Sequence, residues 1–232
     1  MRHPKTQIYM IPFKGLSVDI FEGLVLTNKE FKQWYLPWFT PLEGETIQEY
    51  ASRMLTKIKH PTERCVILGA GFGGVMAQEM AKQAKFKKVV ILASYKSVHE
   101  LSAQMKRIVV ARQYDLIAEK LIADEDLRTE FSLGKTGLKL KQRFARYMFN
   151  FDKIYFKWAV IQLLSWQQSE PMSDILHIHG AQDGVLPLKN INNCIVVPDG
   201  THALVPLKSS WLNAHLLNLI NDNPLQYDYE KQ

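Results

Sequence analysis

The chain has 232 residues, of which 47% are hydrophobic and 22% are charged, and its formal net charge is +6. This composition supports one globular domain with a sizeable core and excludes collagen-like, coiled-coil and intrinsically disordered classes. No segment reaches the roughly 18 consecutive apolar residues of a membrane-spanning helix, and the N-terminus is unlike a secretory signal. We therefore expect a cytoplasmic protein without a membrane partner.

Short apolar runs, rich in β-branched residues, predict the strands of a parallel sheet. Near-continuous apolar runs are typical of strands that are covered on both faces. Helical patterns lie between the runs, and one of them opens with a capping box, Thr46-Ile-Gln-Glu49, and extends to about His60. The alternation predicts an α/β fold with a doubly wound, mostly parallel sheet. The expected strands are Gln7–Pro12, a weaker Gly23–Thr27, Arg64–Gly69, Lys88–Ala93, Ile175–Gly180 and Cys194–Pro198, and further expected helices are Gly74–Lys85 and Ser209–Asn221.

One long segment interrupts this alternation. Ser97–Glu170 shows helical periodicity without a convincing strand, with a break at Gly134–Gly137. It is too long for an ordinary crossover, and ligands of open α/β sheets bind at the carboxyl edge of the strands. We therefore expect a single domain spanning residues 1–232, in which residues 97–170 form a helical cap over that edge.

The sharpest local motif is the glycine-rich run Gly69-Ala70-Gly71-Phe72-Gly73-Gly74, which follows a strand and opens a helix. It can be read as a phosphate-binding loop, as an ordinary tight turn, or as a nucleophile elbow in which Gly71 holds the nucleophile's position. A dinucleotide fingerprint follows the first strand and needs an acidic residue at the end of the next strand. Here the motif follows a later strand, and the next one ends in Ala93-Ser94-Tyr95-Lys96, so the nucleotide interpretation is disfavoured.

Two later turns place an acid and a base at the ends of the last two predicted strands. Asp183 follows Ile175–Gly180, and His202 follows Cys194–Pro198. Each residue alone is typical of an ordinary turn or surface loop. An elbow, then an aspartate, then a histidine at the ends of successive strands is, however, the order of an acyl-transfer triad. In such a triad the aspartate fixes the imidazole tautomer, and the imidazole takes a proton from the nucleophile.

Together these motifs resemble the α/β-hydrolase superfamily, in particular its small bacterial members. The motifs are Gly15-Leu16, Gly69-x-Gly71-Phe72-Gly73-Gly74, His179-Gly180-x-x-Asp183-x-x-x-Pro187 and Gly200-Thr201-His202, and the likeness runs from Gln7 to about Ile220. The resemblance implies hydrolysis of small carboxylic esters or thioesters without a metal or other cofactor. It also implies that the backbone amides of Leu16 and Phe72 form an oxyanion hole, that Asp183 and His202 are catalytic, and that the partner is a small acyl ligand rather than a nucleic acid.

The departure from the family lies at Gly71, which has no side chain that could attack an acyl carbon. Loss of a triad nucleophile costs on the order of a millionfold in rate, so we expect near-background ester hydrolysis. A serine at position 71 should restore the activity. Ser17 and Ser94 lie outside the elbow and are poor substitutes. The glycine is either native to a pseudoenzyme or the result of a Ser→Gly substitution. The chain could also be a non-catalytic binding module, or an enzyme that uses His202 as a non-covalent general base.

Three further groups of residues have a structural and a functional interpretation. His177 and His179 share one face of a strand and are more typical of interior histidines than of a metal pair. The basic residues between Lys135 and Lys157 indicate a solvated helix face, or a site for an anionic ligand such as a coenzyme A conjugate or RNA. The insertion's aromatic residues pack it on the sheet or line an acyl pocket: Tyr147, Phe149, Phe151, Tyr155, Phe156, Trp158 and Trp166. Cys65 and Cys194 are expected to be small hydrophobic residues.

Overall fold

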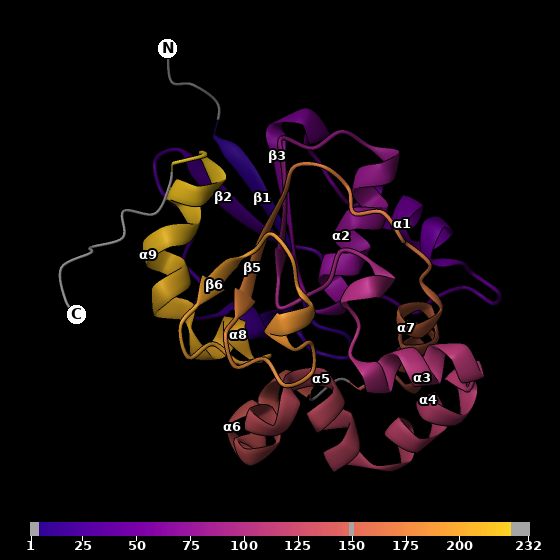
Figure 1. Cartoon of the computed structure of the whole chain (residues 1–232). Helices are drawn as coiled ribbons and strands as arrows, with labels where there is room; N and C mark the ends of the chain where they lie inside the picture. The colour runs from indigo at the N-terminus through magenta and orange to yellow at the C-terminus, as the bar shows by residue number, and fades with distance from the viewer. Residues whose placement is uncertain (1–4, 149–150, 224–232) are drawn as a thin grey trace.

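The computed structural model describes residues 5–148 and 151–223, which form a six-stranded sheet with helices on both faces (Figure 1). All five strand pairings are parallel, and the strand order is β2-β1-β3-β4-β5-β6. The predicted α/β class with a doubly wound parallel sheet is therefore confirmed. The strands are β1 (Thr6–Ile11), β2 (Phe31–Tyr35), β3 (Cys65–Ala70), β4 (Lys88–Leu92), β5 (Ile175–Gly180) and β6 (Ile195–Val197).

The strand order reverses between β1 and β3. The chain leaves β1 towards β2 on one side, then returns past β1 to β3 and continues through β4, β5 and β6 on the other side. Loops on either side of such a reversal diverge and leave a crevice at the carboxyl ends of the strands, where ligands bind. The loop after β1 and the glycine turn after β3 border this crevice, which locates the functional site.

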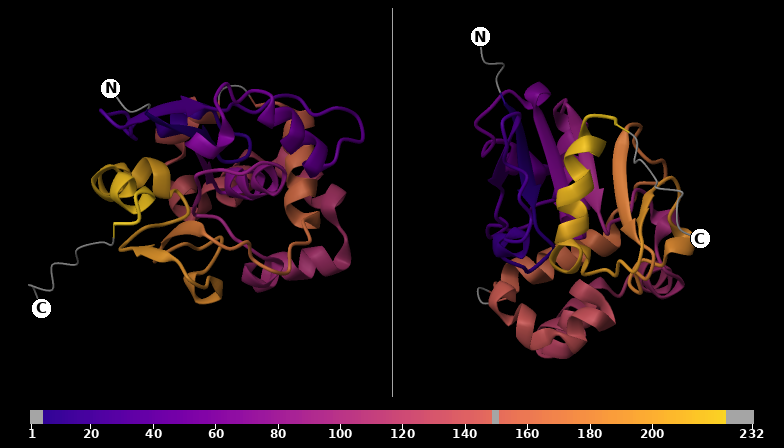
Figure 2. Two further views of the ribbon diagram at one scale, coloured as in Figure 1. Left: turned by 90° about the horizontal axis from the view of Figure 1, so that it is seen from above. Right: turned by 90° about the vertical axis from the view of Figure 1, so that its left-hand side faces the viewer.

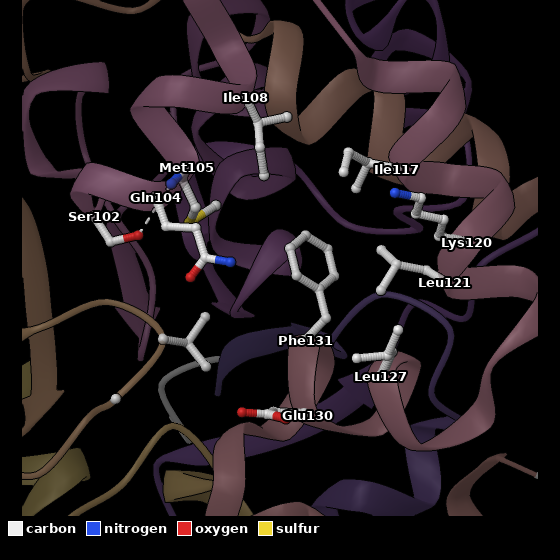
Figure 3. Close-up of a pocket in the computed structure, with 12 residues that line it drawn as sticks. Ser102, Gln104, Met105, Ile108, Ile117, Lys120, Leu121, Leu127, Glu130 and Phe131 are labelled. Atoms are coloured by element: carbon white, nitrogen blue, oxygen red, sulfur yellow. Dashed lines mark hydrogen bonds between the residues drawn. The ribbon is translucent and has the colours of Figure 1, made fainter. Parts of the chain in front are cut away.

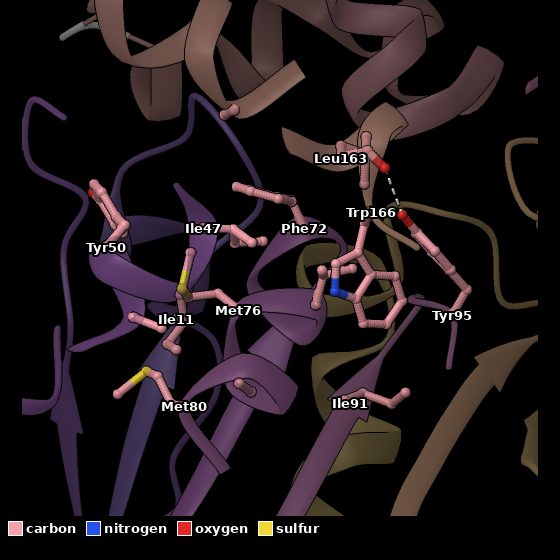
Figure 4. Packing of buried hydrophobic residues seen from close by; sticks show 14 of the residues in the cluster. Ile11, Ile47, Tyr50, Phe72, Met76, Met80, Ile91, Tyr95, Leu163 and Trp166 are labelled. Atoms are coloured by element: carbon pink, nitrogen blue, oxygen red, sulfur yellow. Dashed lines mark hydrogen bonds between the residues drawn. The ribbon is translucent and has the colours of Figure 1, made fainter. Parts of the chain in front are cut away.

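Helices cover both faces of the sheet (Figure 2). Alternate residues of the strands supply the two cores: Tyr9 and Ile67 belong to the core that includes α1 and α2, whereas Ile8 and Val66 belong to the core that includes α9. Figure 4 shows the first of these cores. The helices flanking the sheet are α1 (Ile47–Leu55), α2 (Phe72–Gln83), α8 (Leu204–Leu207), α9 (Ser209–Ile220) and the 3₁₀ turn η1 (Val18–Phe21), with shorter 3₁₀ turns η2 (Thr62–Arg64) and η5 (Leu188–Asn190).

The prediction of a strand at Gly23–Thr27 is wrong, and the second strand is Phe31–Tyr35 instead. Leu24 and Leu26 are buried, as a strand pattern requires, but the Leu24 amide donates to the Phe21 carbonyl at 2.8 Å and the next two amides donate to side chains. The Val25 amide donates to Asn213 Oδ1 at 2.8 Å, and the Leu26 amide donates to Gln33 Oε1 at 2.6 Å. No strand ladder forms because these donors are already used.

Helix α1 begins at the predicted capping box and ends earlier than predicted. Thr46 accepts from the Glu49 amide while Glu49 accepts from the Thr46 amide. The helix stops at Leu55 rather than near His60, because the amides of Lys57 and Ile58 donate to carbonyls three residues back and the Lys59 amide donates to the Tyr9 hydroxyl at 3.0 Å. Helices α2 and α9 lie where they were predicted, within two residues at each end.

Residues 98–165 form a helical insertion at the carboxyl end of the sheet (Figures 1 and 2). Within its described residues there is no strand, and Gly134 breaks α5 with a φ of 74° and a ψ of 179°, as the predicted break requires. The Tyr95 hydroxyl donates to the Leu163 carbonyl at 2.8 Å and ties α7 to the end of β4 (Figure 4). The insertion contains η3 (Val98–Glu100), α3 (Ala103–Ala111), α4 (Tyr114–Ala123), α5 (Glu125–Lys139), α6 (Lys141–Phe144), η4 (Ala145–Met148) and α7 (Lys153–Ser165).

No helix among residues 5–148 and 151–223 has both the length and the hydropathy needed to cross a bilayer.

Close packing of α2 explains the glycine-rich motif after β3. A Cβ on Gly69 would lie 1.9 Å from the Gly73 carbonyl oxygen, and a Cβ on Gly73 would lie 2.4 Å from the Ile11 carbonyl oxygen. A Cβ on Gly74 would lie 2.5 Å from Ser94 Oγ. These glycines let the start of α2 approach three neighbouring strands, so the pattern needs no bound phosphate.

This packing makes Gly73 intolerant of any side chain. We expect Gly73→Ala to lower the free energy of unfolding by about 2 kcal/mol or more, since the methyl group meets rigid backbone. Gly184→Ala is the matched control, because nothing lies within 4 Å of its Cβ position, and its effect should stay within about 0.5 kcal/mol. Urea unfolding of both variants measures the difference, and equal stabilities would contradict this account of the motif.

Candidate functional site

Asp183 and His202 meet at the carboxyl ends of β5 and β6. The His202 Nδ1–H donates to Asp183 Oδ2 at 2.8 Å, and both side chains are buried. The other carboxylate oxygen, Oδ1, accepts the backbone amides of Val185 at 2.9 Å and Leu186 at 2.8 Å. The turn after β5 therefore holds the carboxylate, and the carboxylate fixes the imidazole with Nε2 directed away from it.

The electrostatics of this pair favour an ionised aspartate. Burial alone would raise the pKa of Asp183, but the charge and hydrogen bond of His202, with smaller contributions from His179 and the Leu186 amide, together lower this pKa below its usual 3.8. Such a carboxylate orients the imidazole and stabilises its protonated form, as in an acid-base pair.

Gly71 lies at the turn between β3 and α2, beside this pair. Its φ of 54° and ψ of −120° are a backbone conformation that residues other than glycine adopt only under strain. The space for a side chain at this position is already filled: an ideal Cβ on Gly71 would lie 2.4 Å from Phe13 Cδ1 and 2.9 Å from Phe13 Cε1. The fully buried Phe13 ring also packs edge-on against His202, with ring centroids 5.5 Å apart.

The two predicted oxyanion-hole residues lie in different surroundings. Phe72 is the first residue of α2, so its amide has no acceptor within the helix, and Phe72 lines the same small cavity as Gly71 and His202. The Leu16 amide donates to the Phe13 carbonyl at 3.2 Å within a turn, and Leu16 lines a separate pocket with Tyr147 and Tyr155. The structure therefore brings Gly71, Phe72, Asp183 and His202 together and leaves Leu16 outside.

Two cavities adjoin His202, and a third lies beside the neighbouring Gly184–Val185 turn. The inner cavity, beside Gly71 and His202, has a volume of about 20 Å³ and has room for about one water molecule. A cavity of about 310 Å³ with both polar and apolar walls lies on another side of His202, under the α5 kink. An apolar pocket of about 320 Å³ lies among α3, α4, α5 and the Gly184–Val185 turn, with Phe131 directed into its centre (Figure 3). This outer pocket and the inner cavity share Met105, Phe131 and Val185 as walls.

Sequence reasoning missed Lys14, which also lines the inner cavity. The Lys14 ammonium donates to the Phe131 carbonyl at 3.2 Å and lies 4.3 Å from the centre of the Phe131 ring. Only 4% of the residue is exposed, and within the described residues no carboxylate forms an ion pair with it. Burial lowers the pKa of Lys14 to about 7. Phe13 and Lys14 lie just after β1, at the switch point of the sheet. This position in the sequence could have identified them as candidate site residues.

The two histidines of β5 extend this network inwards. Because the Leu186 carbonyl can only accept, His179 donates to it from Nε2 at 2.8 Å, and its Nδ1 is left to accept from His177 Nε2 at 3.2 Å. Burial lowers the pKa of both histidines, so both are neutral at pH 7. Among the described residues no group of three metal-ligating side chains occurs. The contacts are those of interior histidines.

Neither the two serines weighed as substitute nucleophiles nor the two cysteines expected to be small hydrophobic residues line a cavity with His202. Ser17 caps η1 and donates to Asp19 at 2.7 Å, and Ser94 is buried against Gly74 on α2. Cys65 is buried, which raises its thiol pKa to about 11, and Cys194 is half-buried. Neither serine replaces a nucleophile at the elbow.

The aromatic residues of the insertion mostly pack it onto the rest of the molecule. Tyr155 stacks on Trp38 with centroids 5.2 Å apart, and the Trp166 indole donates to Glu79 at 2.7 Å. None of the predicted aromatic residues lines the 320 Å³ pocket, whose walls are aliphatic side chains, Met105 and Phe131 together with the polar side chains of Ser102, Gln104, Lys120 and Glu130. Phe149 lies outside the described residues. Tyr147 and Tyr155 line a separate cavity of about 250 Å³ beside Leu16, and the packing interpretation of the aromatic residues is the one these contacts favour.

The basic stretch is a solvated face with ion pairs to other segments. Lys141 pairs with Asp126 at 2.7 Å, and Lys157 pairs with Glu119 at 2.6 Å. Arg146 pairs with Glu22 of η1. These exposed pairs favour the structural interpretation of the stretch.

Solved structures with similar folds include several hydrolases and esterases. A hydrolase from Pseudomonas aeruginosa PA01 has a TM-score of 0.66 at 16% sequence identity, over 93% of this chain and 90% of that chain. An esterase from Exiguobacterium antarcticum has a TM-score of 0.66 at 14% identity, over 95% and 93%. A thermophilic esterase from Thermogutta terrifontis has a TM-score of 0.62 at 12% identity, over 94% and 90%.

The chain has the α/β-hydrolase fold. The resemblance inferred from the motifs is thereby confirmed for the fold, over almost the whole chain. No protein-family model and no curated protein matches the sequence. Because one fold hosts many reactions, the activity has to be argued from the site itself.

The buried pair predicts a defined acid dependence of stability. We expect Asp183→Asn to lower the free energy of unfolding by on the order of 3 kcal/mol near neutral pH, because it leaves His202 without its charged partner. The contribution of an ionised Asp183 is present above its usual pKa of 3.8 and is lost as the pH falls through its lower folded-state pKa. The difference in the free energy of unfolding between native protein and variant, measured by urea unfolding, should therefore become smaller below that pH. A difference that stays constant with pH would contradict the pairing.

Proposed function

We propose that this chain is an esterase-type α/β-hydrolase-fold protein that retains the acid-base pair and one oxyanion donor but lacks a nucleophile. Asp183 and His202 would act as the orienting acid and the base, and the Phe72 amide would bind the oxyanion. Residues 97–170 would cap the site within one domain, and the ligand would be a small carboxylic ester, thioester or related acyl compound. The carrying observation is the 2.8 Å bond between His202 and Asp183 directly beside a glycine elbow.

The position of Phe13 supports a native glycine over a laboratory substitution. Removal of a serine side chain from a working elbow would leave open space between position 71 and His202. Here the Phe13 ring fills that space and contacts both residues. The ring and the glycine complement each other, as expected of a chain in which ester turnover has been given up for another use of the site.

The Phe13 ring changes the expected result of restoring a serine. We expect Gly71→Ser alone to raise hydrolysis of p-nitrophenyl butyrate by less than about tenfold, because the new side chain meets the ring. Phe13→Val combined with Gly71→Ser should raise it by at least about a thousandfold, since the serine can then reach His202. Initial rates of native protein, both single variants and the double variant test this.

The Phe13→Val single variant is the control and should remain at background. Thermal unfolding of all four proteins confirms that they are folded. Equal rates for Gly71→Ser and the double variant would show that Phe13 is no obstacle. A folded but inactive double variant, over several acyl lengths, would refute the retained esterase machinery.

The alternative function is ligand binding without turnover, and the outer pocket favours it. A largely apolar pocket of about 320 Å³ is within the range that small-molecule sites occupy. If His202 acted instead as a non-covalent general base, His202→Ala would abolish a turnover that the native protein shows. A binding module would keep its ligand affinity in the same variant.

A further inference from the structure

Lys14 is the one group in the inner cavity that the proposed function leaves without a role. Removing an amine from water is costly unless an anion or several acceptors replace the lost hydration. Lys14 donates one long hydrogen bond to the Phe131 carbonyl, and its ammonium lies over the Phe131 ring. Among the described residues no carboxylate forms an ion pair with it. No negative charge in the surroundings of Lys14 among the described residues therefore balances its ammonium form.

The groups next to Lys14 also favour a negative charge. Phe72 opens the twelve-residue helix α2, so its free amide and the helix dipole direct positive potential at the cavity. Besides Lys14, the titratable residues lining this cavity are Tyr95 and His202. The Tyr95 hydroxyl donates to the Leu163 carbonyl, and burial raises its pKa, so it stays neutral. Asp183 is engaged by His202 and two backbone amides.

We propose that Lys14 and the Phe72 amide form a subsite that binds the carboxylate of an apolar monocarboxylic acid, whose hydrocarbon chain occupies the pocket among α3, α4 and α5. This inference rests on the proposed function and deepens it, because it names the ligand class. One amine and one amide match the single charge and two oxygens of a carboxylate. A phosphate carries more charge and requires more donors than this cavity offers.

Phe131 connects the two parts of the site. Its ring forms a wall of both the inner cavity and the outer pocket, and its carbonyl holds the Lys14 ammonium. The inner cavity has a volume of only about 20 Å³, so a carboxylate enters only when the Phe131 ring swings aside. Met105 and Val185, the other shared walls, are apolar and suit the first carbons of the chain.

The test compares hexanoate with its neutral analogue hexanamide by isothermal titration calorimetry. We expect native protein to bind hexanoate at least about tenfold more tightly than hexanamide. Lys14→Met should lose this preference while keeping its affinity for hexanamide. Lys85→Met, which removes an exposed cation that lines neither the inner cavity nor the outer pocket, is the control and should keep the preference.

Stability separates a binding role from a structural one. A buried amine without a counterion destabilises the fold, so Lys14→Met should melt at a higher temperature than native protein at pH 7. A lower melting temperature would show that Lys14 holds the fold together and would overturn the proposal. Equal affinities of native protein for the two ligands, no binding of either, or an unchanged preference in Lys14→Met would each overturn it too. None of these results affects the esterase proposal, which the turnover of the Phe13→Val/Gly71→Ser variant decides.

Discussion

The Phe13 ring occupies the space through which a side chain at position 71 could reach His202, and the chemistry of the site follows from that contact. A strained turn with positive φ at the end of β3 directs any side chain at position 71 towards the ring. The acid and the base remain hydrogen-bonded and buried beside it. Because glycine has no side chain, position 71 itself offers no group that could form an acyl-enzyme intermediate.

Much of the fold could be predicted from the sequence because buried strands consist of apolar residues. Runs such as Val66–Leu68 are apolar at every position, since both faces of a parallel sheet are covered. The edge strand Phe31–Tyr35 could not be found in this way, because it pairs with β1 alone and is polar at Lys32 and Gln33. Gly23–Thr27 has the pattern of a strand, yet side chains take its amide hydrogen bonds.

Some residues of the candidate site could likewise be predicted from the sequence, and others could not. Asp183 and His202 were predictable because their order and their strand ends follow from the topology. Phe13, Lys14 and the displaced Leu16 amide could not be found, because they depend on how a short loop packs across the switch point. No spacing rule encodes that packing. The glycine at position 71 is visible in the sequence, but the Phe13 ring beside it is visible only in three dimensions.

Labelling with a fluorophosphonate measures nucleophile activation directly and tests whether Phe13 blocks it. Intact mass spectrometry would follow addition at position 71 in Gly71→Ser and in the Phe13→Val/Gly71→Ser double variant under the same conditions. The account predicts fast labelling of the double variant and almost none of the single variant. Equally fast labelling of both would contradict the claim that the Phe13 ring has taken the nucleophile's place.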